Sequence, residues 1–516
     1  MTTEAETGTD IKMQVNVTSA TIPVMVDFGD GNFKPHTIDP TAWAGQRQIS
    51  GTVLGPTLRI KGNLTELEVR ESSLTGITID GCQNLTSLDL SKNLLTDFAI
   101  TGLTPLEYLN LDDNRITNSV SENSTLTLEN CGATLTNLRI SNNPGLRCLD
   151  IRYLTVLEYL SANNNPDLGS VFICPPEEEQ ATLRSISIND CALAHFYPVS
   201  LPNLRTLDLA NNELESGITD ADPFTLGNYP NLTVLNVSGN ANIRELDVTK
   251  CKLLEQLHVY GCSLSALDVT QAPELITLSA SDNKLTSIDL GNNKALTSLY
   301  LAGNPIKELN LTPLINLYTL RISSTLISRV NLINCYYLKS FEAADTKLEF
   351  VDFNGQQTDR MTKIDLRNNP GFTYESMAYT IKTIPVARET HGTEPTLLLE
   401  GSKAGRSDIT WITNADMHWI CDVTGDGSAT WPEIPATLIG ATDTGENKTG
   451  HLDRLYPYFA LPLDYDLDVY QTDGGRFIIA QWEPEWFQSV ASVTDKIRRG
   501  VPTHIHAYPD AGMQFG

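Results

Sequence analysis

The sequence predicts a mainly β fold, a parallel-β solenoid with strands on both sides of each coil, and two regularities lead to this prediction. The first is a 21-residue period, in which the phrase L-x-x-L-x-L-x-x-N-x-L returns between Leu254 and Leu338. The second is the alternation within L-x-L, which predicts a strand whose leucines point inward. One repeat cannot bury such a face alone, but stacked neighbours share a common core.

Fourteen repeats can be indexed by their first apolar residue. They begin at Leu64, Leu85, Leu106, Leu135, Leu157, Leu183, Leu204, Leu232, Leu254, Leu275, Leu296, Leu317, Leu338 and Met361. We number each repeat from that residue, so Leu106 is position 1 and Asn114 is position 9. Insertions lengthen three repeats after position 9, at 117–134, 166–182 and 215–231. We expect all three to project from the same edge of the solenoid.

Position 9 is usually asparagine. It is occupied by Asn93, Asn114, Asn143, Asn165, Asn212, Asn240, Asn283, Asn304 and Asn369. A buried amide both donates and accepts, so these residues are predicted to satisfy the backbone where the chain leaves the strand. Cysteines occupy position 9 at Cys191 and Cys262 and the interior slot before position 1 at Cys82, Cys251 and Cys335. We expect buried free thiols, with disulfides between columns as the alternative.

The second half of each repeat also alternates as a strand would, at 264–269, 285–290 and 306–311. Its polar column contains Asp247, Asp268, Asp289 and Asp352. Stacked carboxylates repel one another unless they are bonded or neutralised. Either local bonds to the backbone and to Thr hydroxyls hold them, or bound cations do.

The consensus LxxLxLxxNxLxxLDLxx resembles the leucine-rich repeat family, and within it the 21-residue bacterial (IRREKO-type) class, over about residues 63–372. This resemblance implies a curved solenoid that binds other proteins. The candidate partner-binding residues are aromatic or basic side chains at outward positions of the first strand: Tyr108, Tyr159, Arg205, His258, Tyr300, Tyr318 and Arg321. Exposed Tyr and Arg are enriched at interface hot spots, although scattered aromatics on a long sheet are the alternative.

The two ends differ in character from the array. We expect a flexible tail at 1–10, an N-terminal β cap at 11–62, a closing segment at 373–405 and a Trp-rich α+β domain at 406–516. The phrase from Val26 to Gly31 resembles the strand and turn of PKD-type β-sandwich modules, which are extracellular. Further expectations are a helix at 374–384, a closing strand at 397–399 and a hairpin over 466–482.

One segment of the C-terminal domain has the ligand spacing of a calcium loop. The oxygen-bearing residues at this spacing are Asp422, Thr424, Asp426, Ser428, Thr430 and Glu433. Gly427 takes the sixth position, where an EF-hand loop turns sharply. The loop predicts either a Ca²⁺ site or a plain Asp-Gly turn, and the sequence indicates no other cofactor.

Composition narrows the classes of function. Lys and Arg total 36 against 63 Asp and Glu, a net charge of −27, which argues against nucleic acid as a partner. The chain contains no apolar run long enough to predict a transmembrane helix. It also lacks the motifs of nucleophilic, phosphate-binding or HExxH metalloenzymes. We therefore expect a non-catalytic binding protein whose partner is another protein.

The architecture resembles surface lipoproteins of Gram-negative gut bacteria. This implies adhesion, binding to a host protein or service as an accessory subunit of an outer-membrane complex. It also implies a place on the extracellular face of the outer membrane, through a lipid anchor outside this chain, or secretion. The alternatives are a glycan-binding protein whose Trp411 and Trp482 stack on sugars, and an enzyme built on His418, His504 and His506.

Overall fold

A computed structural model of the chain describes residues 1–79, 83–99, 105–117, 126–128, 131–173, 180–196, 200–215, 224–225, 229–353, 361–385, 395–402, 404, 420–422, 466–471, 477–483 and 503–506. The chain divides into two compact units, unit 1 at Met1–Lys284 and unit 2 at Leu285–Gly516. Each unit contains part of the repeat array.

Unit 1 contains a parallel ladder of first strands. Its members are β7 (Leu64–Glu68), β9 (Ser87–Asp89), β11 (Tyr108–Asn110), β13 (Asn137–Arg139), β15 (Tyr159–Ser161), β17 (Ser185–Ser187), β18 (Thr206–Asp208), β20 (Val234–Asn236), β22 (Gln256–His258) and β23 (Thr277–Ser279). Each strand pairs in register with the next, as Leu109 does with Leu138. The predicted parallel solenoid is therefore confirmed.

Unit 2 repeats the same arrangement. Its first strands are β24 (Ser298–Tyr300), β25 (Thr319–Arg321), β27 (Ser340–Glu342), β29 (Lys363–Asp365), β30 (Thr396–Leu398) and β31 (Ile420–Asp422), all parallel. The ladder therefore continues beyond residue 372. Between β29 and β30 lies the predicted helix, α1 (Tyr374–Thr383), which Thr373 caps by accepting a hydrogen bond from the Ser376 backbone.

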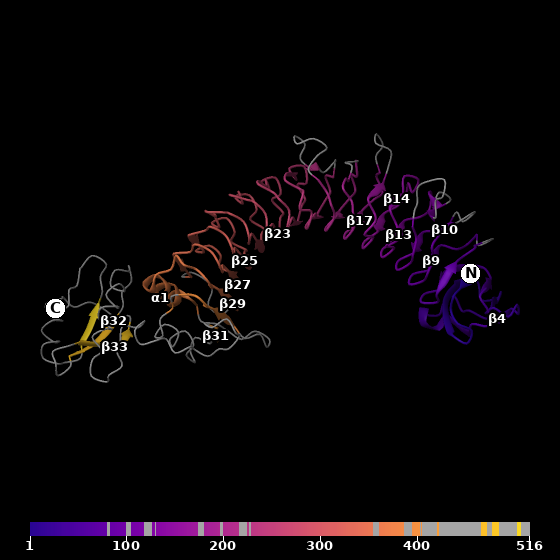
Figure 1. Ribbon diagram of the computed structural model, residues 1–516, viewed down its shortest axis with the longest axis horizontal. Helices are drawn as coiled ribbons and strands as arrows, with labels where there is room; N and C mark the ends of the chain where they lie inside the picture. Colours follow the sequence, from indigo (N-terminus) through magenta and orange to yellow (C-terminus); the bar gives the residue numbers. More distant parts are fainter. Residues whose placement is uncertain are drawn as a thin grey trace. The chain divides into compact units, whose positions relative to one another are not determined.

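The opposite side of the coils carries strands of two or three residues. They form the parallel pairs β10 (Phe98–Ala99) with β12 (Leu126–Thr127), β14 (Cys148–Asp150) with β16 (Ser170–Phe172), β19 (Phe224–Thr225) with β21 (Leu246–Asp247), and β26 (Arg329–Asn331) with β28 (Phe350–Asp352). In unit 1, Figure 1 shows β9, β13 and β17 along one side and β10 and β14 along the other. The segments 264–269, 285–290 and 306–311 contain no strand, contrary to their alternating pattern.

The core is the stack of inward leucines. In the repeat that begins at Leu106, positions 1, 4 and 6 (Leu106, Leu109 and Leu111) are fully buried, and the same columns are buried in the neighbouring repeats. Each buried leucine contributes about 1.5–3 kcal/mol relative to exposure. These rows hold successive coils together.

The coil turns at positions 8 and 9. Position 8 has a left-handed backbone, with φ of 56° at Asp113 and 58° at Asn142, a conformation that Asn and Asp tolerate better than most residues. Position 9 then bonds across the corner. The Asn143 amide donates to the carbonyls of Leu111, Ile140 and Ser141, and its oxygen accepts from the Ile116 backbone at 3.0 Å. The structural role predicted for these asparagines is confirmed.

Cysteine replaces asparagine at two corners. The Cys191 thiol donates to the Ala162 carbonyl and the Cys262 thiol donates to the Val237 carbonyl, each at 3.3 Å. Both cysteines are free and buried, as are Cys251 and Cys335, which confirms the prediction for these four. Cys82 lies outside the described residues. Burial raises the pKa of Cys262 to about 11 and that of Cys335 to about 12.

An antiparallel cap covers the N-terminal end of the ladder. Strand β2 (Asp10–Val17) pairs with β5 (Gln48–Thr52) and β7, while β3 (Val24–Asp27) lies between β4 (Lys34–His36) and β6 (Arg59–Lys61). A short 3-10 helix, η1 (Ala44–Gln46), precedes β5. The Asp27 carboxylate accepts from the backbones of Gly29 and Gly31, which fixes the turn after β3.

Residues 1–10 differ from the flexible tail that their polar composition predicted. Strand β1 (Thr2–Thr3) pairs with β8 (Leu74–Gly76). The Thr3 hydroxyl donates to the Ser72 carbonyl at 2.6 Å, and Thr3 is 5% exposed. These contacts join residues some seventy positions apart, and composition cannot reveal them.

Within the C-terminal part, β32 (Asp466–Gln471) pairs antiparallel with β33 (Phe477–Glu483) and with β34 (Thr503–His506). The predicted hairpin is therefore present, and the His504-x-His506 pair falls on a strand.

Candidate partner-binding face

On the outward face of the first strands, the backbone N–H of position 7 repeatedly needs a hydrogen-bond acceptor. In ten of the coils that the structure describes, a side-chain oxygen accepts from this N–H, in one of two ways. Where position 5 is Asp or Asn, that residue supplies the oxygen itself. Examples are Asp89 to the Ser91 N–H at 2.9 Å and Asp208 to the Ala210 N–H at 3.2 Å. The same bond recurs at Asn110, Asn236 and Asp365.

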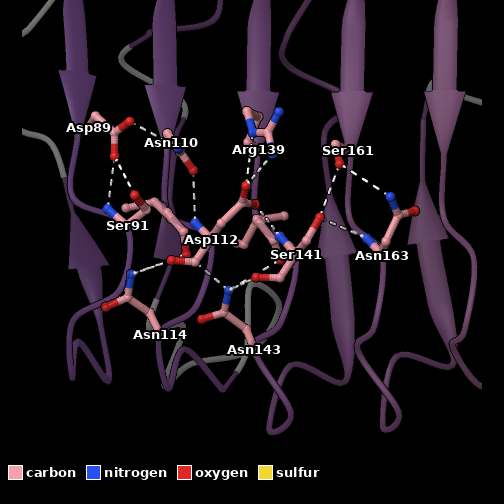
Figure 2. Close-up of polar contacts among 12 residues, drawn as sticks. Asp89, Ser91, Asn110, Asp112, Asn114, Arg139, Ser141, Asn143, Ser161 and Asn163 are labelled. Atoms are coloured by element: carbon pink, nitrogen blue, oxygen red, sulfur yellow. Dashed lines mark hydrogen bonds and ion pairs between the residues drawn. The ribbon is translucent and has the colours of Figure 1, made fainter. Parts of the chain in front are cut away.

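Where position 5 is another residue, position 7 of the preceding coil supplies the oxygen. Asp112 accepts from the Ser141 N–H at 2.7 Å, and Ser141 in turn accepts from the Asn163 N–H at 3.0 Å. Asn163, Ser238 and Ser323 do the same for Asn189, Tyr260 and Ala344. Figure 2 shows this chain of polar contacts from Asp89 to Asn163. Many polar residues on the face are therefore structural.

The aspartates of the opposite side have a comparable local explanation. Asp247 accepts from the Thr249 backbone at 2.9 Å and from its hydroxyl at 2.6 Å, and Asp268 bonds Thr270 in the same way. These bonds lower the pKa of both carboxyls. Asp289 accepts from the Gly291 backbone. Local bonding, the first of the two alternatives, accounts for these three residues.

At the N-terminal end of unit 1 the face is a network of charges. Arg70 lies 2.6 Å from Asp89 and 3.1 Å from Glu68, and Arg139 lies 2.7 Å from Asp112. Tyr108 is half-buried among them, and burial followed by the Asp89 charge raises the pKa of its hydroxyl. Tyr108, one of the predicted binding residues, is thus surrounded by ion pairs.

Unit 2 gathers three of the predicted residues in one place. Tyr300 and Arg321 are paired neighbours on β24 and β25, and the Arg321 guanidinium lies 5.2 Å from the centre of the Tyr300 ring. Tyr318 directly precedes β25, and the Lys339 ammonium lies 5.9 Å from its ring centre. Tyr318 is 42% exposed.

One carboxylate joins two cations beside this group. Glu342, on β27, lies 2.9 Å from the Arg321 Nε and 3.1 Å from the Lys363 Nζ. We call Tyr300, Tyr318, Arg321, Lys339, Glu342 and Lys363 the unit 2 patch. Its last three members were not among the residues predicted from the sequence. Lys339 and Glu342 follow Tyr318 and Arg321 by one 21-residue period, so the repeat register was the signal that could have found them.

The remaining predicted residues lie apart from one another in unit 1. Tyr159 is exposed on β15, Arg205 precedes β18 and is exposed, and His258 is half-buried on β22. Burial lowers the pKa of His258, while the Asp208 carboxylate opposes that shift. The structure does not join these residues into one cluster.

The predicted calcium loop falls mostly outside the described residues. Asp422 ends β31, where its backbone pairs with Leu398, whereas Thr424, Asp426, Ser428, Thr430 and Glu433 lie outside. The same holds for His418 and Trp411. Within the part of the chain that the structure describes, no three His, Cys, Asp or Glu side chains converge as metal ligands. No described helix has the length and apolar character needed to cross a membrane.

Comparison with known proteins gives matches to the repeats and to the fold. Models described as leucine rich repeat and as two copies of leucine rich repeats match residues 62–116 and 202–249. No curated protein sequence matches the chain.

Two solved structures illustrate the similarity in fold. A leucine-rich repeat protein of Leptospira interrogans has 20% identity and a TM-score of 0.50, over 69% of this chain and 94% of that one. The functional domain of the internalin InlJ from Listeria monocytogenes has 22% identity and a TM-score of 0.48, over 67% and 77%. The matches to the repeat models and the parallel ladders together show that the chain carries leucine-rich repeats, stacked as a solenoid of parallel strands.

Proposed function

We propose that this chain is a non-catalytic binding protein and that the unit 2 patch holds a protein partner. The observation that supports this most is the pairing of Tyr300 with Arg321 on adjacent strands, flanked by the exposed Tyr318. Tyr and Arg, together with Trp, are enriched among the residues that dominate interface energies.

The patch differs from the polar residues around it in what its side chains do. Asp365, which lies on β29 with Lys363, accepts from the backbone of Arg367, and Ser323 accepts from that of Ala344. The contacts of Tyr300 and Arg321 are instead between side chains, and an exposed cation–π contact contributes only about 0.5–1 kcal/mol. A partner can therefore engage these side chains without breaking the backbone bonds of the coil.

The internal contacts of the patch also favour binding. Stacking on Tyr300 and pairing with Glu342 restrict the Arg321 side chain before any partner arrives. Ordering a flexible side chain at an interface costs about 0.5–1.5 kcal/mol. Part of that cost is therefore met in the free protein.

A capture experiment with matched variants tests the proposal. The full chain is immobilised and exposed to surface proteins of the source cell and of candidate hosts, and bound proteins are identified by mass spectrometry. We expect a protein that wild type retains and that the double variant Y300A/R321A does not. The control is Y159A/R205A, which removes the same residue types from unit 1. Equal retention by wild type and Y300A/R321A would reject the patch as the binding site.

Our proposal places the protein at the cell surface, lipid-anchored at the outer membrane or secreted, in adhesion or as an accessory subunit of an outer-membrane complex. The resemblance to surface lipoproteins and the PKD-like phrase from Val26 to Gly31 support this location. Protease treatment of intact cells tests it. The protein should be cleaved without lysis, whereas protection until lysis would contradict a surface location.

The loop from Asp422 to Glu433 is a further part of the proposal, as a Ca²⁺ site supported by its ligand spacing. Isothermal titration of the full chain should show one Ca²⁺ site that D426A abolishes. Unchanged heat in D426A would refute it.

A further inference from the structure

The unit 2 patch is cationic at its surface, although the protein as a whole carries a net charge of −27. Arg321 and Lys363 are 50% and 38% exposed, whereas the Glu342 side chain between them is 14% exposed. The carboxylate therefore lies beneath its two cations. A molecule that approaches the face meets positive charge first.

The coil that contains Lys363 repeats this layering. Arg367 is 38% exposed and binds the Asp365 carboxylate, which is 4% exposed, through two nitrogens at 2.9 and 2.7 Å. Asp365 in turn accepts from the Arg367 backbone. Over β24 to β29 the outward face therefore presents exposed cations above recessed carboxylates. Lys339 adds a further cation beside Tyr318.

The first-strand face of unit 1 has the same layering at Arg70 over Asp89 and at Arg139 over Asp112, but half-buried or exposed glutamates offset these cations. At outward positions it carries more acidic than basic residues. The acidic ones are Glu66, Glu68, Asp89, Glu107, Asp112, Glu158, Asp208 and Glu255, and the basic ones are Arg70, Arg139, Arg184 and Arg205. The positive character is thus a local property of unit 2.

The two tyrosines add an apolar component. Tyr318 is exposed beside its Lys339 contact, and Tyr300 lies beneath the Arg321 guanidinium. Tyrosine combines a large apolar ring with a polar tip, which suits a contact surface that is partly wet. A ligand that fits the patch offers both negative charge and apolar area.

We propose that the unit 2 patch binds an acidic segment of a protein partner. Asp or Glu side chains of that segment pair with Arg321, Lys339 and Lys363, and an aromatic or aliphatic residue lies against Tyr300 and Tyr318. This inference rests on the proposed protein-binding function and adds the chemistry of the partner. Guanidinium groups favour it, because they bind carboxylates through two parallel hydrogen bonds.

The charge pattern also predicts how binding depends on salt. The cations of the patch are solvent-exposed, and exposed charges are screened over about 8 Å at physiological ionic strength. Binding should weaken as salt rises, mainly through a slower association rate. A partner recognised only through the tyrosines would show little change.

A peptide selection tests the inference without knowledge of the partner. A phage library of random 12-residue peptides is selected on the full chain and counter-selected on R321A/K363A. Enriched peptides are then measured by fluorescence anisotropy. We expect enrichment in Asp and Glu near an aromatic or aliphatic residue, and at least tenfold weaker binding to R321A/K363A. Replacement of the peptide's Asp and Glu by Asn and Gln should weaken binding to a similar degree.

The matched control is R184A/R329A. It removes two exposed arginines that each pair with a glutamate, as Arg321 does, but outside the patch. It should bind the peptides as wild type does. Enriched peptides that are neutral or basic, or that bind R321A/K363A equally well, would overturn the inference, as would failure to enrich any patch-dependent sequence. The capture experiment with Y300A/R321A decides separately whether the patch binds protein at all.

Discussion

Replacement of Asn143 by alanine should destabilise the solenoid by an amount that the hydrogen bonds of that corner define. Asn143 is fully buried, and its side chain takes part in four hydrogen bonds. Each of the three carbonyls to which Asn143 donates also accepts from a second donor, which remains in N143A. Asn114 donates to Leu111, Asn165 to Ile140 and Asp113 to Ser141.

The Ile116 backbone N–H is the group whose partner the substitution removes. Its acceptor is the Asn143 oxygen. A buried donor left without a partner costs about 1–3 kcal/mol. We therefore expect N143A to lower the free energy of unfolding by about 1–3 kcal/mol, rather than by the sum of four lost bonds.

N143D separates this explanation from simple loss of volume. The aspartate has nearly the same shape and can still accept from the Ile116 backbone, but its second oxygen faces three carbonyl oxygens. An uncompensated buried charge costs about 3–5 kcal/mol. Burial raises the pKa of the introduced carboxyl above its unfolded value of about 3.9. The additional loss of stability in N143D, compared with N143A, should therefore be complete at neutral pH. It should disappear as the pH falls through that raised pKa towards 4.

Urea unfolding followed by circular dichroism measures both variants, with the slope checked for loss of cooperativity. The predicted order of stability at pH 7 is wild type, N143A, then N143D. If N143D were as stable as wild type, the amide would not be donating to these carbonyls. That result would refute the corner described here.

Three further predictions concern other parts of the coils. S141A should lower the free energy of unfolding by about 1 kcal/mol, because the Asn163 N–H loses its acceptor. Adding S161N to that variant should restore stability by supplying an oxygen from position 5. If urea unfolding showed no rescue, the two alternative ways of satisfying the N–H of position 7 would be contradicted. Because burial raises the pKa of Cys335 to about 12, its thiol should react with DTNB at pH 8 only on unfolding, and rapid modification of its peptide in the native protein would disagree. Burial lowers the pKa of His258, so its contribution to stability is fully present above the unfolded pKa of about 6.5, where the imidazole is neutral. Wild type should therefore lose stability relative to H258Q as the pH falls from 7 to 5. An NMR titration showing a raised pKa for His258 would contradict this.

The periodic features of the fold could be read from the sequence. The spacing of the leucines defines the register of each strand, and the asparagine column marks each corner, because both depend on local geometry that every coil repeats. The helix before Pro385 followed from its pattern in the same way. These predictions needed no knowledge of contacts between distant residues.

Other features depend on contacts that the pattern does not encode. Alternation at 264–269 reports which side chains are buried, but backbone pairing with the next coil is a separate property. The left-handed corner at position 8 is occupied by residues as different as Lys92 and Ser324, which hides it from a search for glycine. The pairing of Thr3 with Ser72 joins distant parts of the chain.

The candidate site was predictable in part. Its exposed Tyr and Arg residues were found by counting outward positions, and the structure brings Tyr300, Tyr318 and Arg321 together. Sequence alone did not separate them from Tyr108, which lies within an ion-pair network. Nor did it distinguish polar residues that satisfy the backbone from those that are available to a partner.

That distinction is tested most directly by the stability of two sets of alanine variants, measured by urea unfolding. The first set, D89A, D208A and D365A, removes oxygens that accept from position 7, and each variant should lose about 1 kcal/mol or more. The second set, Y300A and R321A, removes side chains of the unit 2 patch and should stay within about 0.5–1 kcal/mol of wild type. If the second set lost as much stability as the first, the side chains of the patch would stabilise the fold, and the proposal that they are available to a partner would be contradicted.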